Sequence, residues 1–153
     1  MRAIPLALAL TLALTLPGSA MARPSATWQA QGAFAALRVG NLETMMGWYR
    51  DALGFELVSH QKERNAALLK RGGSVLELIQ VTGRPKAAGA AQDLAQPGVI
   101  KIGFVVDDFD RLQASLAGNR VTVLGKVITS DVDGLRTLAV TDPEGNMLQF
   151  FGR

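Results

Sequence analysis

The feature that most constrains the fold is a repeated order of predicted elements: a strand, a helix and three strands, twice along the chain. The first copy is predicted to hold strands at 34–40, 55–61, 65–70 and 74–81 and a helix at 42–53. The second is predicted to hold strands at 99–106, 121–129, 135–141 and 147–151 and a helix at 109–117. Alignment of the copies puts Phe34 opposite Lys101 and Glu77 opposite Gln149.

Both predicted helices have start and stop residues. Asn41 and Asp108 stand where a helix N-cap is expected, because their short side chains can accept a hydrogen bond from a free backbone N–H. Gly54 and Gly118 stand where each helix should end. We therefore expect the two copies to begin in the same way.

A turn near the end of the chain precedes the last strand. Pro143 pre-sets φ, Gly145 supplies a positive φ, and Asp142 can hydrogen-bond back onto the turn backbone. Beyond it, Gln149 shares a strand face with apolar neighbours. This pattern predicts either a half-buried structural amide or a side chain that points into a ligand cleft.

The repeat predicts an α+β fold of two βαβββ modules that form a curved sheet around a cleft, with the helices outside. The modules span 33–81 and 99–151, and the Gly-, Pro- and Ala-rich residues 82–98 read as a linker. We expect one domain over 23–153, which is long enough to bury a sizeable core.

Residues 1–22 have the pattern of a secretory signal peptide. Arg2 is followed by an apolar run that is too short to span a bilayer comfortably, and residues 20–22 fit a small-residue cleavage site. We therefore expect export across the inner membrane to the periplasm, with no membrane segment after cleavage. An uncleaved anchor is the alternative.

The absence of cysteine and the distribution of charge exclude several kinds of chemistry and one class of partner. The chain has no cysteine, which excludes disulfides, thiolate chemistry and cysteine-bound zinc. The formal charge is +3, and the basic residues are scattered among acidic ones. Because no basic stripe or nucleic-acid motif is present, we expect no nucleic-acid partner.

Three stretches together resemble the vicinal oxygen chelate superfamily, which includes glyoxalase I, bleomycin-resistance proteins and extradiol dioxygenases. They are LRVGNLE at 37–43, WYRDALGF at 48–55 and DPEGN at 142–146. The resemblance extends from about Ala33 to Phe151. It implies the paired-module fold and a ligand cleft.

The resemblance also implies four cleft positions that hold a metal in metal-using members. Here they are Phe34, Glu77, Lys101 and Gln149. Phe34 has no donor atom and the Lys101 ammonium has no lone pair, so only two of the four side chains can be ligands. We expect no bound metal and no other cofactor.

Six residues are candidates for the site. Lys101 could offer its charge to an anionic or oxygen-rich ligand, or form a structural ion pair with Glu77. Arg38 could anchor a ligand carboxylate or lie at the rim. Gln149, Phe34 and Phe151 would line the cleft. Glu77 could act as a general base, although Lys101 nearby would oppose basicity.

Two functions from different classes follow. The first is a metal-independent binder of a small amphipathic or anionic molecule, similar to the bleomycin-resistance branch. The second is a glyoxalase-type lyase or isomerase that uses Glu77 in proton transfer. Whether the protein is an enzyme stays open, as does the ligand. Homodimerisation is plausible from the resemblance.

Two further residues and one loop are expected to have structural roles only. Tyr49 is expected in the core with its hydroxyl satisfied locally, and His60 on a strand surface. Residues 130–134 have too few carboxylates for calcium and read as a loop.

Overall fold

The computed structural model describes residues 32–83 and 98–153. The first module contains β1 (Ala33–Val39), α1 (Leu42–Leu53), β2 (Glu56–Gln61), the short helix η1 (Lys62–Arg64), β3 (Ala66–Arg71) and β4 (Ser74–Gln80). The second contains β5 (Lys101–Val105), α2 (Phe109–Gly118), β6 (Val123–Thr129), β7 (Arg136–Thr141) and β8 (Met147–Gly152). The predicted signal peptide and most of the predicted linker lie outside the described residues.

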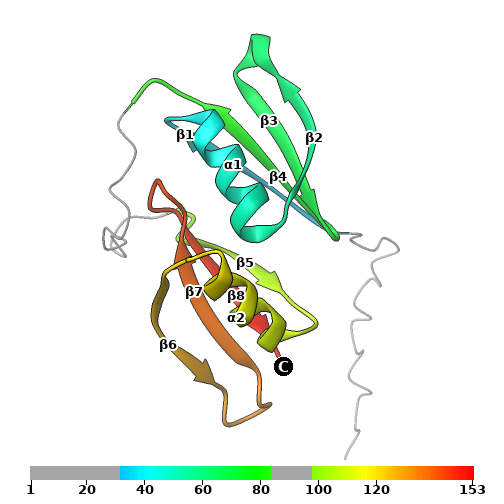
Figure 1. Ribbon diagram of the computed structural model, residues 1–153, viewed down its shortest axis with the longest axis vertical. Coiled ribbons are helices and arrows are strands. Elements are labelled where there is room, and N and C mark those ends of the chain that lie inside the picture. The colour runs from blue at the N-terminus through cyan, green and yellow to red at the C-terminus, as the bar shows by residue number, and fades with distance from the viewer. Residues whose placement is uncertain (1–31, 84–97) are drawn as a thin grey trace, which may run out of the picture.

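The two modules have the same sheet topology. The N-terminal sheet has the order β1-β4-β3-β2 and the C-terminal sheet the order β5-β8-β7-β6. In each, the first strand pairs in parallel with the last, and the other neighbours are antiparallel. The predicted α+β class and its two βαβββ modules are confirmed. In Figure 1 each helix lies in front of its own sheet.

The helix caps largely follow the sequence. The Asn41 side chain accepts a hydrogen bond from the backbone N–H of Thr44, and Asp108 does the same for Arg111. Gly54 adopts a left-handed conformation with φ of 66° and ends α1. Gly118 is the last residue of α2, as expected, and the chain then turns through Asn119 and Arg120, the latter with φ of 56°.

One hydrophobic cluster contains buried residues of both modules. The helix residues Met45, Tyr49 and Phe109 are fully buried in it, together with Leu78 and Leu148 from the two sheets. Alternate strand residues point to opposite faces, so one face of each sheet packs against helices and the other does not. We call this second face of each sheet its helix-free face.

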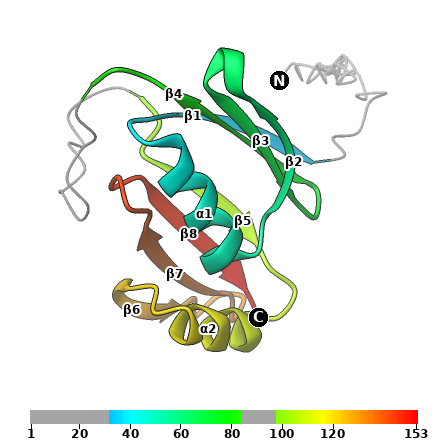
Figure 2. The same cartoon turned by 45° about the horizontal axis from the view of Figure 1, so that its top comes forward.

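The two four-stranded sheets stay separate within one chain. No strand of one sheet is hydrogen-bonded to a strand of the other within the described residues. Instead α1 contacts the C-terminal module, and Figure 2 shows α1 between the N-terminal sheet and β8. β1 and β5 therefore each pair on one side only.

Candidate functional site

Three predicted site residues lie together on the helix-free face of the N-terminal sheet. Phe34 and Arg38 come from β1 and are exposed, and Glu77 comes from β4 and is half-buried. Glu77 stands opposite Ala36 in the register, so Phe34 and Arg38 are its diagonal neighbours on β1. Leu68 on β3 flanks it on the other side. The face thus places one carboxylate among apolar groups, with a guanidinium close by.

The other three predicted site residues lie together on the helix-free face of the C-terminal sheet. Lys101 comes from β5 and is exposed, whereas Gln149 and Phe151 come from β8 and are half-buried. Lys101 stands opposite Met147, one side-chain step along that face from Gln149. Residues of the two modules that align in sequence therefore occupy equivalent places in the two sheets.

Gln149 has an unusual environment. Its Nε2 donates to the Thr137 hydroxyl at 2.8 Å, whereas Oε1 is buried and has no hydrogen-bond partner among the described residues. Both cross-strand neighbours are small, Gly103 on β5 and Ala139 on β7. A buried acceptor without a donor costs free energy, so this carbonyl marks a place where a donor is missing.

Within the described part of the chain, the three predicted site residues of the N-terminal sheet form no ion pair or hydrogen bond with the three of the C-terminal sheet. Among the described residues, the ion pairs are Arg50 with Asp51 and Arg136 with Asp110, and His60 Nε2 lies 3.7 Å from Glu43 Oε1. The Glu77–Lys101 ion pair considered from the sequence is not among them. Within one chain the groups lie on separate sheets that share no strand pairing.

The four positions that would hold a metal do not provide a suitable ligand set. Phe34 offers only carbon atoms, and Lys101 presents N–H donors in place of lone pairs. Glu77 and Gln149 remain, and two ligands do not make a cation site of the usual kind. In addition, no cluster of three or more His, Cys, Asp or Glu residues suited to a metal occurs in the described ranges.

The turn predicted before β8 has a role that the sequence did not reveal. Glu144, which is buried, accepts hydrogen bonds from the backbone N–H groups of Gly40 and Asn41 at 2.8–2.9 Å. These groups lie at the junction of β1 and α1 in the other module. The carboxylate thus sits at the positive end of the α1 dipole and ties the modules together. Its burial could not be predicted from a turn motif.

Both carboxylate oxygens of Asp142, in the same turn, accept hydrogen bonds. Its Oδ1 accepts from the backbone N–H groups of Glu144 and Asn146, as predicted, and its Oδ2 accepts from the Tyr49 hydroxyl at 3.0 Å. Tyr49 is in the core as predicted, but its partner is distant in sequence. Burial raises the pKa of Tyr49 well above its usual value, and Asp142 raises it further. Burial also raises the pKa of Asp142, against the opposing effect of its hydrogen bonds.

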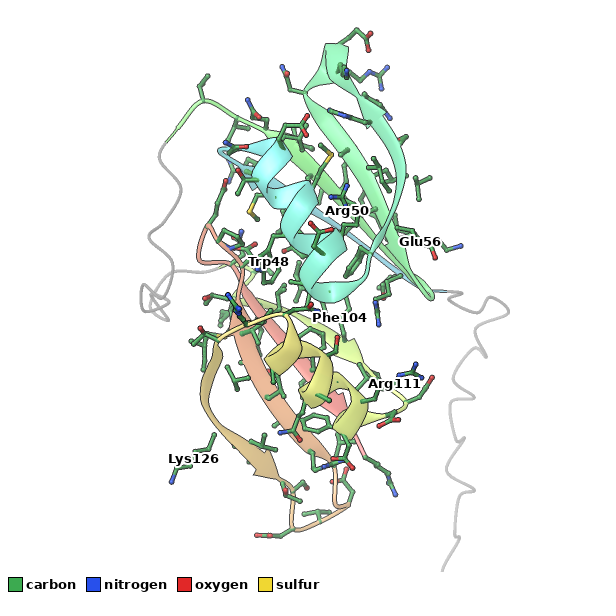
Figure 3. All side chains as sticks on the ribbon, viewed as in Figure 1. Trp48, Arg50, Glu56, Phe104, Arg111 and Lys126 are labelled. Carbon is green, nitrogen blue, oxygen red and sulfur yellow. The ribbon has the colours of Figure 1, made fainter. Side chains whose placement is uncertain are left out.

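A pocket of about 760 Å³ opens between the modules on the helix side of the sheets. Phe55, Phe104 and Phe150 line it, with Arg71 and Arg111 among the charged residues. Figure 3 shows Phe104 where the two modules meet. None of the six predicted site residues lines this pocket.

Two other expectations have clear outcomes. His60 is half-buried and its Nε2 lies 3.7 Å from Glu43 of α1, away from both helix-free faces. Residues 130–134 form a loop held by local hydrogen bonds from the backbone N–H groups of Val132 and Leu135. The described helices include none that is long and apolar enough to cross a membrane.

Three solved structures with similar folds are distant from this chain in sequence. An integron cassette protein from the mobile metagenome of the Halifax Harbour sewage outfall has 21% identity and a TM-score of 0.63, over 80% of this chain and 97% of that one. Lactoylglutathione lyase from Agrobacterium tumefaciens has 19% identity and a TM-score of 0.59, over 85% and 96%. TioX from Micromonospora sp. ML1 has 21% identity and a TM-score of 0.62, over 79% and 97%. These similarities show the fold alone.

A search of curated proteins gave no match. Residues 32–150 match the family described as the Glyoxalase/Bleomycin resistance protein/Dioxygenase superfamily. This match covers both modules and includes five of the six predicted site residues, and Phe151 lies one residue beyond its end. The chain therefore belongs to the Glyoxalase/Bleomycin resistance protein/Dioxygenase superfamily.

Proposed function

We propose that this protein is an exported member of the family that binds a small amphipathic, anionic molecule without a metal. The observation that carries the proposal is the charge of the C-terminal sheet. None of its four strands contains an aspartate or glutamate. The helix-free face of this sheet instead combines the Lys101 ammonium with Phe151, Met147 and the Gln149 amide. Such a surface favours an apolar ligand that carries a negative charge.

A second copy of the chain would complete the site. Phe34 and Val105 are 62% and 85% exposed on the helix-free faces, and Ile128 is 65% exposed. Among the described strands, none pairs with the outer edge of β1 or of β5, so each edge could pair with a strand of another chain. Pairing of β1 from one copy with β5 from the other would extend the two sheets into one. Phe34, Arg38 and Glu77 would then face Lys101, Gln149 and Phe151 across a single cleft.

The test uses anilinonaphthalene sulfonate, an aromatic anion of the proposed class. We expect saturable binding by calorimetry, and Lys101→Met should weaken it by about tenfold or more, since charge-assisted contacts contribute about 1.5–3 kcal/mol. Lys126→Met is the matched control, because Figure 3 shows Lys126 on β6 pointing away from the rest of the molecule. Equal loss in both variants, or none in either, would contradict the proposal.

The dimer has its own test. Light scattering after gel filtration should give the mass of two chains, and Phe34→Glu/Val105→Glu should give one chain with an unchanged circular dichroism spectrum. The reason is that carboxylates at these exposed positions would repel or be desolvated in the pairing. A monomeric parent protein would exclude the shared cleft.

One observation supports a second function, a lyase or isomerase of the glyoxalase type. Glu77 is half-buried with Ala36 and Leu68 beside it, which is a setting in which a carboxylate can serve as a general base. Glu77→Gln separates the two functions. A binder should keep its affinity for the dye within a few-fold, whereas an enzyme should lose turnover and keep its substrate affinity.

A further inference from the structure

The pocket between the modules lies on the helix side of both sheets, and we propose that it is a second binding site, for a planar aromatic molecule that carries a carboxylate. None of the six predicted site residues lines it, so the inference does not depend on the cleft, the dimer or the ligand proposed above. Its volume of about 760 Å³ is within the usual range of about 300–1,000 Å³ for small-molecule sites.

The floor of this pocket is aromatic and comes from both modules. The Phe104 ring stacks on Phe150, with centroids 5.5 Å apart, and makes an edge-to-face contact with Phe55, with centroids 5.9 Å apart. Phe55 and Phe150 are buried, whereas Phe104 is only half-buried. Leu53 and Leu112 extend the apolar surface. Ring surface that stays accessible in a concave site favours a flat apolar ligand, because aromatic rings stack or meet edge to face.

Arg71 is held at this pocket by the end of α1. Its Nη1 donates to the Leu53 carbonyl, which lies in the last turn of the helix and has no partner within it. Gly54 makes room for this contact, because a Cβ there would clash with the guanidinium. A guanidinium has five N–H donors, so most of them stay available when one is used. The end of α1 thus presents an oriented cation to the pocket.

The charges that line the pocket leave an excess of guanidinium. Six lining residues are charged: Lys70, Arg71 and Arg111 are basic, and Glu56, Asp107 and Asp108 are acidic. Glu56 stands opposite Lys70 in the strand register, where opposite charges offset each other. The Asp108 side chain caps α2 through the Arg111 backbone N–H. Two guanidiniums, one from each module, remain against the single carboxylate of Asp107, so the site favours an anion.

The kind of anion follows from the guanidiniums and the floor together. Within the described residues neither Arg71 nor Arg111 forms an ion pair. A guanidinium binds a carboxylate through two parallel hydrogen bonds, which suits it better than a point charge does. Figure 3 shows Phe104 at the junction of the modules and Arg111 beside α2. A carboxylate attached directly to an aromatic ring satisfies both features of the pocket.

The test measures binding of 2-naphthoate, an aromatic carboxylate, by calorimetry. It uses Lys101→Met, because this background lacks the ammonium on which the proposed function depends. We expect saturable binding, and addition of Ser115→Trp should weaken it by about tenfold or more, since Ser115 lines the pocket from α2 and an indole would fill the space. Ala114→Trp is the matched control, because Ala114 is its exposed neighbour on α2 and does not line the pocket.

Recognition of charge has its own variants in the same background. Arg111→Met should weaken 2-naphthoate binding by about tenfold or more, because charge-assisted hydrogen bonds are lost. Arg64→Met, at an exposed arginine of η1, should leave the affinity unchanged. The neutral 2-naphthalenemethanol should bind at least about tenfold more weakly than the acid. Equal affinity for the alcohol and the acid would refute the carboxylate.

Two results would overturn the inference. One is the absence of saturable 2-naphthoate binding to Lys101→Met. The other is equal binding by the Ser115→Trp and Ala114→Trp forms of that protein, with unchanged circular dichroism spectra.

The proposed function fails on a different result, which is equal binding of anilinonaphthalene sulfonate to the parent protein and to Lys101→Met. Loss of 2-naphthoate binding in Lys101→Met, with retention in Ser115→Trp alone, would place the aromatic acid on the helix-free face and refute the site between the modules.

Discussion

The hydroxyl of Tyr49 donates a hydrogen bond to Asp142 Oδ2 at 3.0 Å, and this contact joins α1 of the first module to the turn before β8 in the second. Both side chains are buried. Glu144 adds bonds to Gly40 and Asn41, and the Asn119 amide donates to the Ala52 carbonyl at 3.2 Å. Polar contacts therefore hold the modules at both ends of α1.

Removal of the Tyr49 hydroxyl should weaken this junction. Tyr49→Phe keeps the ring packed and takes one donor from a buried carboxylate, so we expect the free energy of unfolding to fall by about 1–3 kcal/mol. Urea denaturation measures the change. An unchanged midpoint would mean that the contact contributes nothing to stability.

Alkaline pH should destabilise the parent protein through the same residue. The folded pKa of Tyr49 is raised above its usual value of 10.0, so the unfolded chain releases the proton first as the pH rises. Stability is then fully present below about pH 10 and falls until the pH reaches the folded pKa. Tyr49→Phe should lack this loss.

The chain contains one tyrosine, so its ultraviolet absorbance titration reports Tyr49 alone. The native protein should titrate at a higher pH than the protein in urea. Coincident titrations would contradict the buried hydrogen bond.

The negative charge of Glu144 should contribute to the stability of the folded protein. Glu144→Gln keeps the shape and one acceptor oxygen but removes the charge-assisted bonds to Gly40 and Asn41, so we expect a loss of about 1–3 kcal/mol. Hydrogen exchange at these two amides should accelerate. Glu43→Gln is the matched control, because Glu43 is an exposed acidic residue in the first turn of the same helix. Similar effects in both variants would assign the result to the helix dipole alone.

Two glycines should respond in opposite directions to replacement by alanine. A Cβ at Gly152 would lie 2.7 Å from the Val106 carbonyl oxygen, whereas a Cβ at Gly118 would contact nothing within 4 Å. We expect Gly152→Ala to lower the melting temperature, because the backbone at Val106 must move. Gly118→Ala should raise stability by about 0.5–1 kcal/mol, since it lies in a helix. An unchanged melting temperature in Gly152→Ala would show that the Val106 backbone approaches Gly152 less closely than the structure indicates.

The local elements could be predicted from the sequence because their signals are local. Apolar periodicity and the caps Asn41 and Gly54 placed α1 at its observed bounds, and the strands agree within about two residues. Strand alternation also predicted that Gln149 shares a strand face with apolar residues, and Gln149 lies on the same face as Met147 and Phe151 in the structure. Each of these features depends on neighbours only a few residues away.

The contacts between modules were decided by tertiary structure. Nothing near Glu144 indicated that it would accept hydrogen bonds from the start of α1, and nothing near Tyr49 identified Asp142 as its partner. The sequence alone determined two βαβββ modules and the side chains that each sheet presents. Only the tertiary structure shows that α1 packs against the second module and that the two sheets stay separate within one chain. The physical reason is that burial of α1 and of these carboxylates depends on groups about a hundred residues apart, for which a local pattern carries no signal.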